Sequence, residues 1–236
     1  MNGLFITFEG TEGSGKSTHI QLLAERIRAQ GRVVRVLREP GGTPIGEEIR
    51  HTLKHSEQNR AMTAEAELLL MNASRAQLVR EVIRPALAAG EVILCDRFYD
   101  STTAYQGHGR QLDLTLVRGV IDFAVGATRP HLTLLLMVPL RISEARRRER
   151  QQRLALELAP KSNPTPRHVP LPFAAPLRDR MEEADRSFFE RVEKGYQAIA
   201  SAEPQRVRCV DTTQNVETVR AEIWQLVELL VSAARA

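Results

Sequence analysis

The apolar positions of this chain gather in five short runs that alternate with longer segments of helical periodicity. Runs of nearly continuous apolar residues, separated by helices, are typical of parallel strands that are covered on both faces. The pattern therefore predicts an α/β fold, a three-layer sandwich around a five-stranded parallel sheet. The predicted strands are 4–8, 33–37, 91–95, 132–138 and 207–210.

The segments between these runs carry apolar residues at a spacing of three and four, which predicts helices. The predicted helices are 16–30, 45–54, 64–89, 100–106, 113–125, 142–158 and 216–230. Ligands of such sheets bind at the carboxyl ends of the strands. Three unusual segments directly follow strands, at 10–17, 38–44 and 96–97. We expect these three segments to meet in one cleft.

The first of these segments fits the phosphate-loop pattern G-x-x-x-x-G-K-[ST] through Gly10, Gly15, Lys16 and Ser17. Its glycines allow backbone N–H groups to curl around an anion, and the following helix adds its positive N-terminal end. Lys16 would reach the outer phosphates and Ser17 would hold Mg²⁺. The alternative is a glycine-rich turn with an exposed lysine. The strand and helix favour nucleotide binding, and the predicted ATP contacts are Gly10, Thr11, Glu12, Gly13, Ser14, Gly15, Lys16, Ser17 and Thr18.

Composition limits the other possibilities. The 236 residues are 42% hydrophobic and 26% charged, with a net charge of +4, as in an ordinary soluble protein. A chain of this length could form one α/β domain or two small ones, and we predict a single domain over 1–236. Basic residues interleaved with aromatics are absent, so we expect no nucleic-acid partner. We find no signal peptide or membrane span. Cys95 and Cys209 lack metal-ligand spacing, which indicates free thiols in a reducing cytoplasm.

The run from Asp96 to Arg110 suggests what receives the phosphate. Asp96, at the end of a strand beside the phosphate loop, is placed to act on Mg²⁺, although it could also cap a helix. Arg97 could bind a second phosphate through two parallel hydrogen bonds from its guanidinium. The hydroxyls and amide that follow suit the polar edge of a ring, and they belong to Ser101, Thr102, Tyr105 and Gln106.

Arginines crowd the helix predicted at 142–158, including Arg146, Arg148 and Arg150. They could close over a transferring phosphoryl group and stabilise its charge, or they could form a solvated basic face. The chain around them is predicted to be a lid over 141–180 with a proline-rich insert at 159–177. The insert is interpreted as an extended surface loop, with partner docking as the alternative.

Taken together, the motifs resemble those of the bacterial thymidylate kinases, which are nucleoside monophosphate kinases. The resemblance rests on FEGTEGSGKST, REPGGT, SRAQLV, DRFYDSTTAYQG, RPHLTLLL and DRMEEADRSFFERVEKGY, and it covers nearly the whole chain. It implies a P-loop nucleoside monophosphate kinase fold and a homodimer. It also implies phosphorylation of dTMP to dTDP by ATP and Mg²⁺, for dTTP biosynthesis.

The resemblance also implies roles for single residues. Glu12 would contact the sugar 3′-hydroxyl of dTMP, Arg97 its phosphate and Arg75 its thymine ring, while Tyr105 would crowd the ribose 2′ position. Arg150 is the first choice for the lid arginine on the transferring phosphate. The implied catalytic residues are Lys16, Asp96, Arg97 and Arg150, with Arg146 on ATP and with Ser17 and Asp96 on the metal. The implied acceptor pocket consists of Glu12, Glu39, Pro40, Met71, Arg75, Arg97, Ser101, Thr102, Tyr105 and Gln106.

Two positions and the lid depart from the family pattern. Met71 stands where most members stack a phenylalanine on thymine, Met137 replaces an aspartate at the end of a strand, and the proline-rich insert lengthens the lid. Two alternatives therefore remain beside the thymidylate kinase interpretation. One is a kinase for another pyrimidine nucleotide or a deoxynucleoside, and the other is a nucleotide-binding regulator with weak catalysis.

Overall fold

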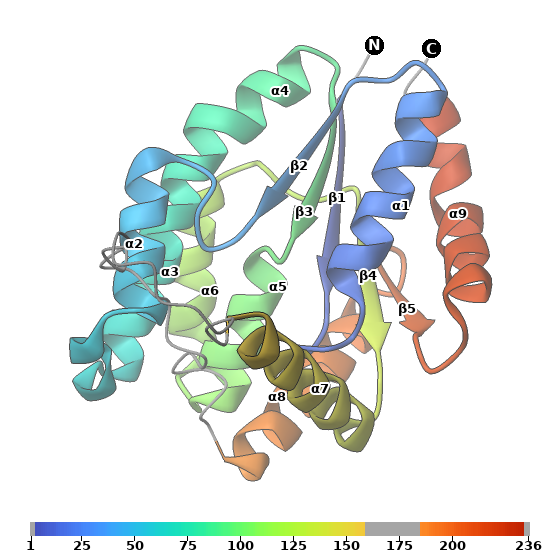
Figure 1. Ribbon diagram of the computed structural model, residues 1–236. Coiled ribbons are helices and arrows are strands. Elements are labelled where there is room, and N and C mark those ends of the chain that lie inside the picture. The colour runs from blue at the N-terminus through green and yellow to red at the C-terminus, as the bar shows by residue number, and fades with distance from the viewer. Residues whose placement is uncertain (1–2, 159–184, 234–236) are drawn as a thin grey trace, which may run out of the picture.

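The computed structural model contains the predicted sheet of five parallel strands, in the order β2-β3-β1-β4-β5 (Figure 1). It describes residues 3–158 and 185–233. β1 lies at the centre of the sheet, between β3 and β4, so the loop that follows β1 opens at the middle of the carboxyl edge. The strands are β1 (Leu4–Glu9), β2 (Val34–Arg38), β3 (Val92–Asp96), β4 (Leu132–Met137) and β5 (Val207–Asp211).

Several helices begin at a residue whose side chain caps them. Thr43 accepts a hydrogen bond from the backbone of α2, and Asp113 and Asp185 do the same for α6 and α8. The α-helices are α1 (Lys16–Ala29), α2 (Pro44–Lys54), α3 (Ala64–Leu78), α4 (Arg84–Ala88), α5 (Tyr99–Thr102), α6 (Leu114–Val125), α7 (Leu140–Leu158), α8 (Arg186–Ala202) and α9 (Val216–Ala233). The other helical segments are the 3₁₀ helix η1 (Glu57–Ala61) and the π-helical η2 (Val79–Ile83) and η3 (Thr103–Gly109).

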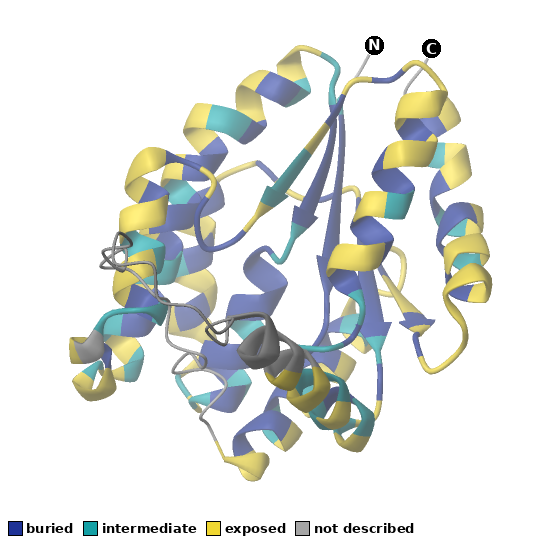
Figure 2. Ribbon diagram, in the orientation of Figure 1, coloured by how far each residue is buried: buried dark blue, intermediate teal, exposed yellow. Residues whose placement is uncertain are grey.

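Both faces of the sheet are covered, which confirms the three-layer prediction. α1 and α9 pack on one face, and α3, α4 and α6 pack on the other (Figure 1). β1, β3 and β4 are almost entirely buried between these layers (Figure 2). Trp224 belongs to the core between α9 and α1, with 6% of its surface exposed. Burial of this apolar surface is the main stabilising contribution to the sandwich.

The structure adds a π-helical turn and one further helix to the predicted helical segments. The helical stretch predicted over 64–89 contains the π-helical turn η2 directly before α4. Pro85 has no N–H to donate, and its ring would collide with the carbonyl one turn earlier in an unbroken α-helix. In addition, α8 was not among the predicted helices. Its buried residues are Phe188, Phe189, Val192, Gly195, Tyr196 and Ile199.

Both cysteines are free, as predicted, with Cys95 buried and Cys209 exposed. Within the described ranges, no helix combines the length and the apolar character needed to cross a membrane. The proline-rich insert at 159–177 lies outside the described residues. So does the side chain of Arg150, although its backbone is part of α7.

Candidate active site

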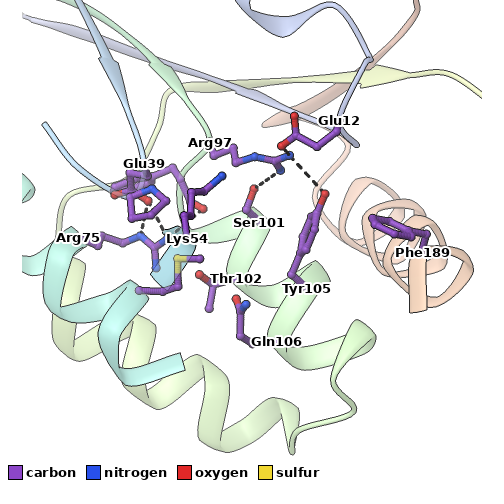
Figure 3. A pocket seen from close by; sticks show the side chains of 13 residues that line it. Glu12, Glu39, Lys54, Arg75, Arg97, Ser101, Thr102, Tyr105, Gln106 and Phe189 are labelled. Atoms are coloured by element: carbon purple, nitrogen blue, oxygen red, sulfur yellow. Dashed lines mark hydrogen bonds and ion pairs between the residues drawn. The ribbon is translucent and has the colours of Figure 1, made fainter. Parts of the chain in front are cut away.

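A pocket of about 530 Å³, measured out to open solvent, lies at the carboxyl edge of the sheet (Figure 3). The phosphate loop, the segment after β2 and the segment after β3 all reach it, as expected for the cleft. All ten residues predicted for the acceptor pocket line it. The complete lining is Glu12, Glu39, Pro40, Lys54, Met71, Arg75, Arg97, Phe98, Ser101, Thr102, Tyr105, Gln106 and Phe189.

The phosphate loop follows β1 and ends where α1 begins, which is the predicted order. Gly10 has a φ of 129°, and a Cβ there would lie 2.4 Å from the carbonyl oxygen of Leu136 on the neighbouring strand, so only glycine fits. The Lys16 ammonium donates to the carbonyl oxygens of Gly10, at 3.1 Å, and Thr11, at 2.9 Å. The loop is therefore folded around its own lysine, which is buried within reach of an incoming phosphate.

Burial and the neighbouring positive charge of Arg97 lower the pKa of Lys16 to about 8. Only the protonated ammonium can pair with a phosphate, and above pH 8 an increasing fraction of the unliganded protein lacks it. We therefore expect kcat/KM for ATP to fall by up to tenfold per pH unit above about pH 8. The decrease in kcat should occur at higher pH than the decrease in kcat/KM, because bound phosphates stabilise the protonated ammonium. Initial rates between pH 6.5 and 10 at constant ionic strength test this, and a flat kcat/KM profile would contradict it.

Ser17 and Asp96, the two predicted metal ligands, lie together. The Ser17 hydroxyl donates to a carboxylate oxygen of Asp96 at 3.3 Å. Phe98 is the N-cap residue of α5, and no side chain caps this helix, so Asp96 does not cap it. Among the described residues no group of three or more histidine, cysteine or acidic side chains could hold a metal by itself. One hydroxyl and one carboxylate fit a cation that takes its remaining ligands from phosphates and water, as Mg²⁺ does.

Arg97 connects the phosphate loop to the acceptor pocket. Its backbone continues the ladder from β3, donating to the carbonyl of Phe8 at 2.9 Å, and its φ of 71° turns the side chain back across the cleft. The guanidinium donates to the Glu12 carboxylate at 2.9 Å and to the Ser101 hydroxyl at 3.0 Å. It also donates to the hydroxyls of Tyr105 and Tyr196, each at 3.3 Å.

A buried carboxylate at Glu9 holds the turn that carries Arg97. Glu9 accepts from the backbone N–H groups of Phe98, at 2.8 Å, and Ser101, at 3.3 Å. It also accepts from the Ser101 hydroxyl and from the Tyr196 hydroxyl, the latter at 2.9 Å. Burial and the negative charge of Asp100 raise the pKa of Glu9. Glu9 was not among the predicted site residues, although a single acid within an apolar strand was a usable signal.

Asp100 and Arg206 form an ion pair that also holds the turn after β3. Asp100 accepts two hydrogen bonds from Arg206, at 2.7 and 2.8 Å, and one from the Thr133 hydroxyl at 3.1 Å. Arg206 directly precedes β5, more than a hundred residues away in the chain. Because its partner is so distant in sequence, the role of Asp100 was not predictable from local motifs.

Arg75 and Glu39 form a buried ion pair at the other end of the pocket, with a shortest distance of 2.7 Å and 2% and 3% of their side chains exposed. Arg75 also donates to the Asn72 side chain at 2.7 Å and to the carbonyl of Phe98 at 3.2 Å. Burial raises the pKa of Glu39 to about 7, although Arg75 opposes the shift. These contacts fix Arg75 against the pocket wall beside Met71.

Gln106 is also held in place, since its amide donates to the buried carboxylate of Glu67 at 2.8 Å. Arg110 donates to the same carboxylate at 3.1 and 3.2 Å. The polar residues predicted to contact a ring edge therefore project from a rigid wall formed by α5 and η3.

The arginine-rich helix α7 lies beside the phosphate loop. Arg146 donates to the carbonyl oxygens of Gly13, at 3.3 Å, and Thr212, at 3.0 Å, so it bridges the loop and the end of β5. The Arg147 guanidinium lies 5.5 Å from the ring centroid of Phe189, which lines the pocket. Arg148 is exposed.

A phosphate loop facing a second polar pocket across one edge of a five-stranded parallel sheet defines a P-loop kinase of the nucleoside monophosphate type. Comparison with known proteins narrows this class. The family model described as "Thymidylate kinase" matches residues 8–163. The chain belongs to the thymidylate kinase family, whose members phosphorylate dTMP to dTDP with ATP as the phosphoryl donor.

Individual relatives agree with this assignment. The chain is 42% identical over 228 residues to a thymidylate kinase from Alcanivorax borkumensis, covering 97% of both chains. It is 43% identical over 235 residues to one from Pseudomonas savastanoi pv. phaseolicola, with complete coverage of both. A crystal structure of thymidylate kinase from Ehrlichia chaffeensis superposes with a TM-score of 0.71 at 27% identity, covering 97% of this chain and 99% of the other.

Proposed function

We propose that the pocket binds dTMP and that the phosphate loop binds ATP, so that the γ-phosphoryl group passes between them to give dTDP. The observation that carries this proposal is the convergence of the ten expected acceptor residues, from four separate segments, on one pocket. Glu12 and Arg97 stand at its border with the phosphate loop. The acceptor phosphate would therefore lie next to the ATP phosphates, as phosphoryl transfer requires.

The chemistry needs positioning and charge stabilisation rather than a side-chain nucleophile. Lys16 and the loop N–H groups hold the ATP phosphates, and Arg97 holds the acceptor phosphate. Arg146, which is anchored on the loop, lies next to the nucleotide. Arg75, Thr102 and Gln106 present fixed polar groups to the base, while Met71 packs against its face and Tyr105 against its sugar.

Mg²⁺ is part of this proposal, with Ser17 and Asp96 as the residues that would hold it. When bound, it would neutralise the negative charge on the ATP phosphates. Two observations support this assignment. The Ser17 hydroxyl lies 3.3 Å from a carboxylate oxygen of Asp96, and both groups offer the oxygen ligands that Mg²⁺ prefers.

The lid is expected to supply the arginine that stabilises the negative charge of the transferring phosphoryl group. Arg150→Ala should lower kcat by about 10²-fold or more while changing the affinity for ATP much less, because the arginine acts on the charge of the transferring group. Arg148→Ala is the matched comparison on the same helix. Steady-state kinetics with both substrates varied distinguish them, and a loss of kcat in Arg148→Ala instead would move the assignment to Arg148.

A homodimer and a cytoplasmic location complete the proposal. α2, α3 and α6 lie side by side on one flank of the molecule (Figure 1). They expose the apolar side chains of Ile45, Leu69, Leu116 and Phe123 by 51% to 84%, and self-association through a twofold axis would be the means of covering them. The two free thiols fit a reducing compartment. Sedimentation equilibrium would test the dimer.

The function is tested by measuring ADP release from MgATP with dTMP, dUMP, dCMP, dGMP, thymidine or no acceptor. We expect strong stimulation by dTMP and weaker stimulation by dUMP. Preference for another pyrimidine nucleotide would reassign the acceptor. Binding of ATP without stimulation by any acceptor would support a regulator, although membership of the thymidylate kinase family favours the enzyme.

A further inference from the structure

Lys54 is a third cationic side chain in the acceptor pocket, beside Arg75 and Arg97, and the sequence motifs did not single it out. It is the last residue of α2, and it is half-buried. In Figure 3 it lies on the side of Glu39, across the pocket from Tyr105 and Phe189. Lys54 therefore belongs to the wall opposite α5 and η3, which carry Ser101, Thr102, Tyr105 and Gln106.

The cations of this pocket differ in position and in side-chain chemistry. Arg75 is fixed within the wall by the buried carboxylate of Glu39. Arg97 is fixed at the border with the phosphate loop by Glu12 and the hydroxyls around it. Lys54 has a flexible stem and a compact ammonium, which can follow an anion more easily than a planar guanidinium can.

The positive charge of Lys54 reaches the place where the phosphate loop meets the acceptor pocket. Burial would raise the pKa of Glu12, but Arg97, Lys16 and Lys54 together hold it well below its usual range. Three cations thus act on one carboxylate at this border. Such a convergence of positive potential suits an anion with two negative charges, and the phosphate is the only strongly anionic group of a nucleoside monophosphate.

We propose that Lys54 binds the acceptor phosphate together with Arg97, from the opposite wall of the pocket. Lys54 then determines specificity for the phosphorylated acceptor over the free nucleoside, and it keeps the phosphate in line with the ATP site. This inference rests on the assignment of the pocket to dTMP.

The test compares dTMP with thymidine, which has the same base and sugar but no phosphate, by isothermal titration calorimetry on the full chain. Lys54→Met removes the charge and keeps the length of the side chain, and Lys54→Arg keeps the charge. Lys194→Met is the matched control, because Lys194 is exposed on α8 and does not line the pocket.

We expect Lys54→Met to weaken dTMP binding about tenfold, the effect of losing one charge-assisted contact, and to change thymidine binding less than twofold. Lys54→Arg should restore most of the dTMP affinity, and Lys194→Met should leave both ligands unaffected. In steady-state assays KM for dTMP should rise more than kcat falls.

An equal loss for dTMP and thymidine in Lys54→Met, or no loss for either, would overturn the proposal. Arg97→Met in the same titrations separates this from a failure of the pocket assignment. If Arg97→Met loses dTMP affinity while Lys54→Met does not, only the role of Lys54 is wrong. If neither variant loses affinity although the wild-type protein binds dTMP, dTMP binds elsewhere.

Discussion

Lys16→Ala is expected to lower kcat for dTMP phosphorylation by roughly 10²–10³-fold or more, with the fold and dTMP affinity largely retained. Lys16 is the buried cation of the phosphate loop, and its charge would stabilise the outer phosphates most strongly as the γ-phosphoryl group leaves. The carbonyl oxygens of Gly10 and Thr11 would lose this donor. Coupled measurement of ADP release gives the rate.

Two controls make this result interpretable. Thermal unfolding and calorimetric titration with dTMP establish that the variant is folded and that its acceptor pocket is intact. Lys194→Ala, on the exposed face of α8, controls for the loss of one positive charge from the molecule. Near-normal turnover in Lys16→Ala would mean that the loop does not bind the transferring phosphates.

Arg97→Ala is expected to weaken dTMP binding by about 10²-fold, because a bidentate contact between guanidinium and phosphate combines two charge-assisted hydrogen bonds. It should also lower stability by about 1–3 kcal/mol, since Glu12 and Tyr196 lose a partner in a partly buried setting. The free energy of unfolding from urea titration and the dissociation constant from calorimetry separate the two effects.

Arg97→Lys distinguishes charge from geometry at this position. The lysine keeps the positive charge but cannot make the forked contact, so its dTMP affinity should lie between those of the wild type and Arg97→Ala. Thymidine serves as the control ligand. If thymidine binding falls as much as dTMP binding in both variants, Arg97 supports the shape of the pocket and does not hold the phosphate.

Local patterns were sufficient for the parts of the site that depend on neighbouring residues. The phosphate loop is such a part, because the strand, the glycines, Lys16 and Ser17 are consecutive and their geometry follows from backbone freedom. The meeting of Glu39 and Arg97 in one cleft could also be predicted from the sequence, since both residues come directly after parallel strands whose carboxyl ends share one edge. The helical stretch predicted over 64–89 is present as α3, η2 and α4, but the pattern did not show that a π-helical turn precedes Pro85.

The contacts of Glu9 and Asp100, and the place of Lys54 in the pocket, could not be inferred in the same way. Glu9 holds the turn after β3 through backbone N–H groups that are some ninety residues away, and Asp100 pairs with Arg206 across more than a hundred residues. Lys54 looked like an ordinary residue at the end of a helix. A sequence pattern reports the spacing of residues along the chain, and it does not report which distant side chains share a buried environment.

Periodicity and contiguous motifs were enough to predict the parallel sheet and the position of the phosphate loop, and the resemblance to a family supplied the residues expected in the acceptor pocket. Which charges act on one another could be learned only from the folded molecule, because the charged residues concerned are far apart in the chain. Folding places Arg97 on Glu12, Arg75 on Glu39 and Lys54 in the same pocket, and burial there strengthens each electrostatic interaction. The chemical character of the site thus depends on distances that arise only when the five strands and their helices pack together.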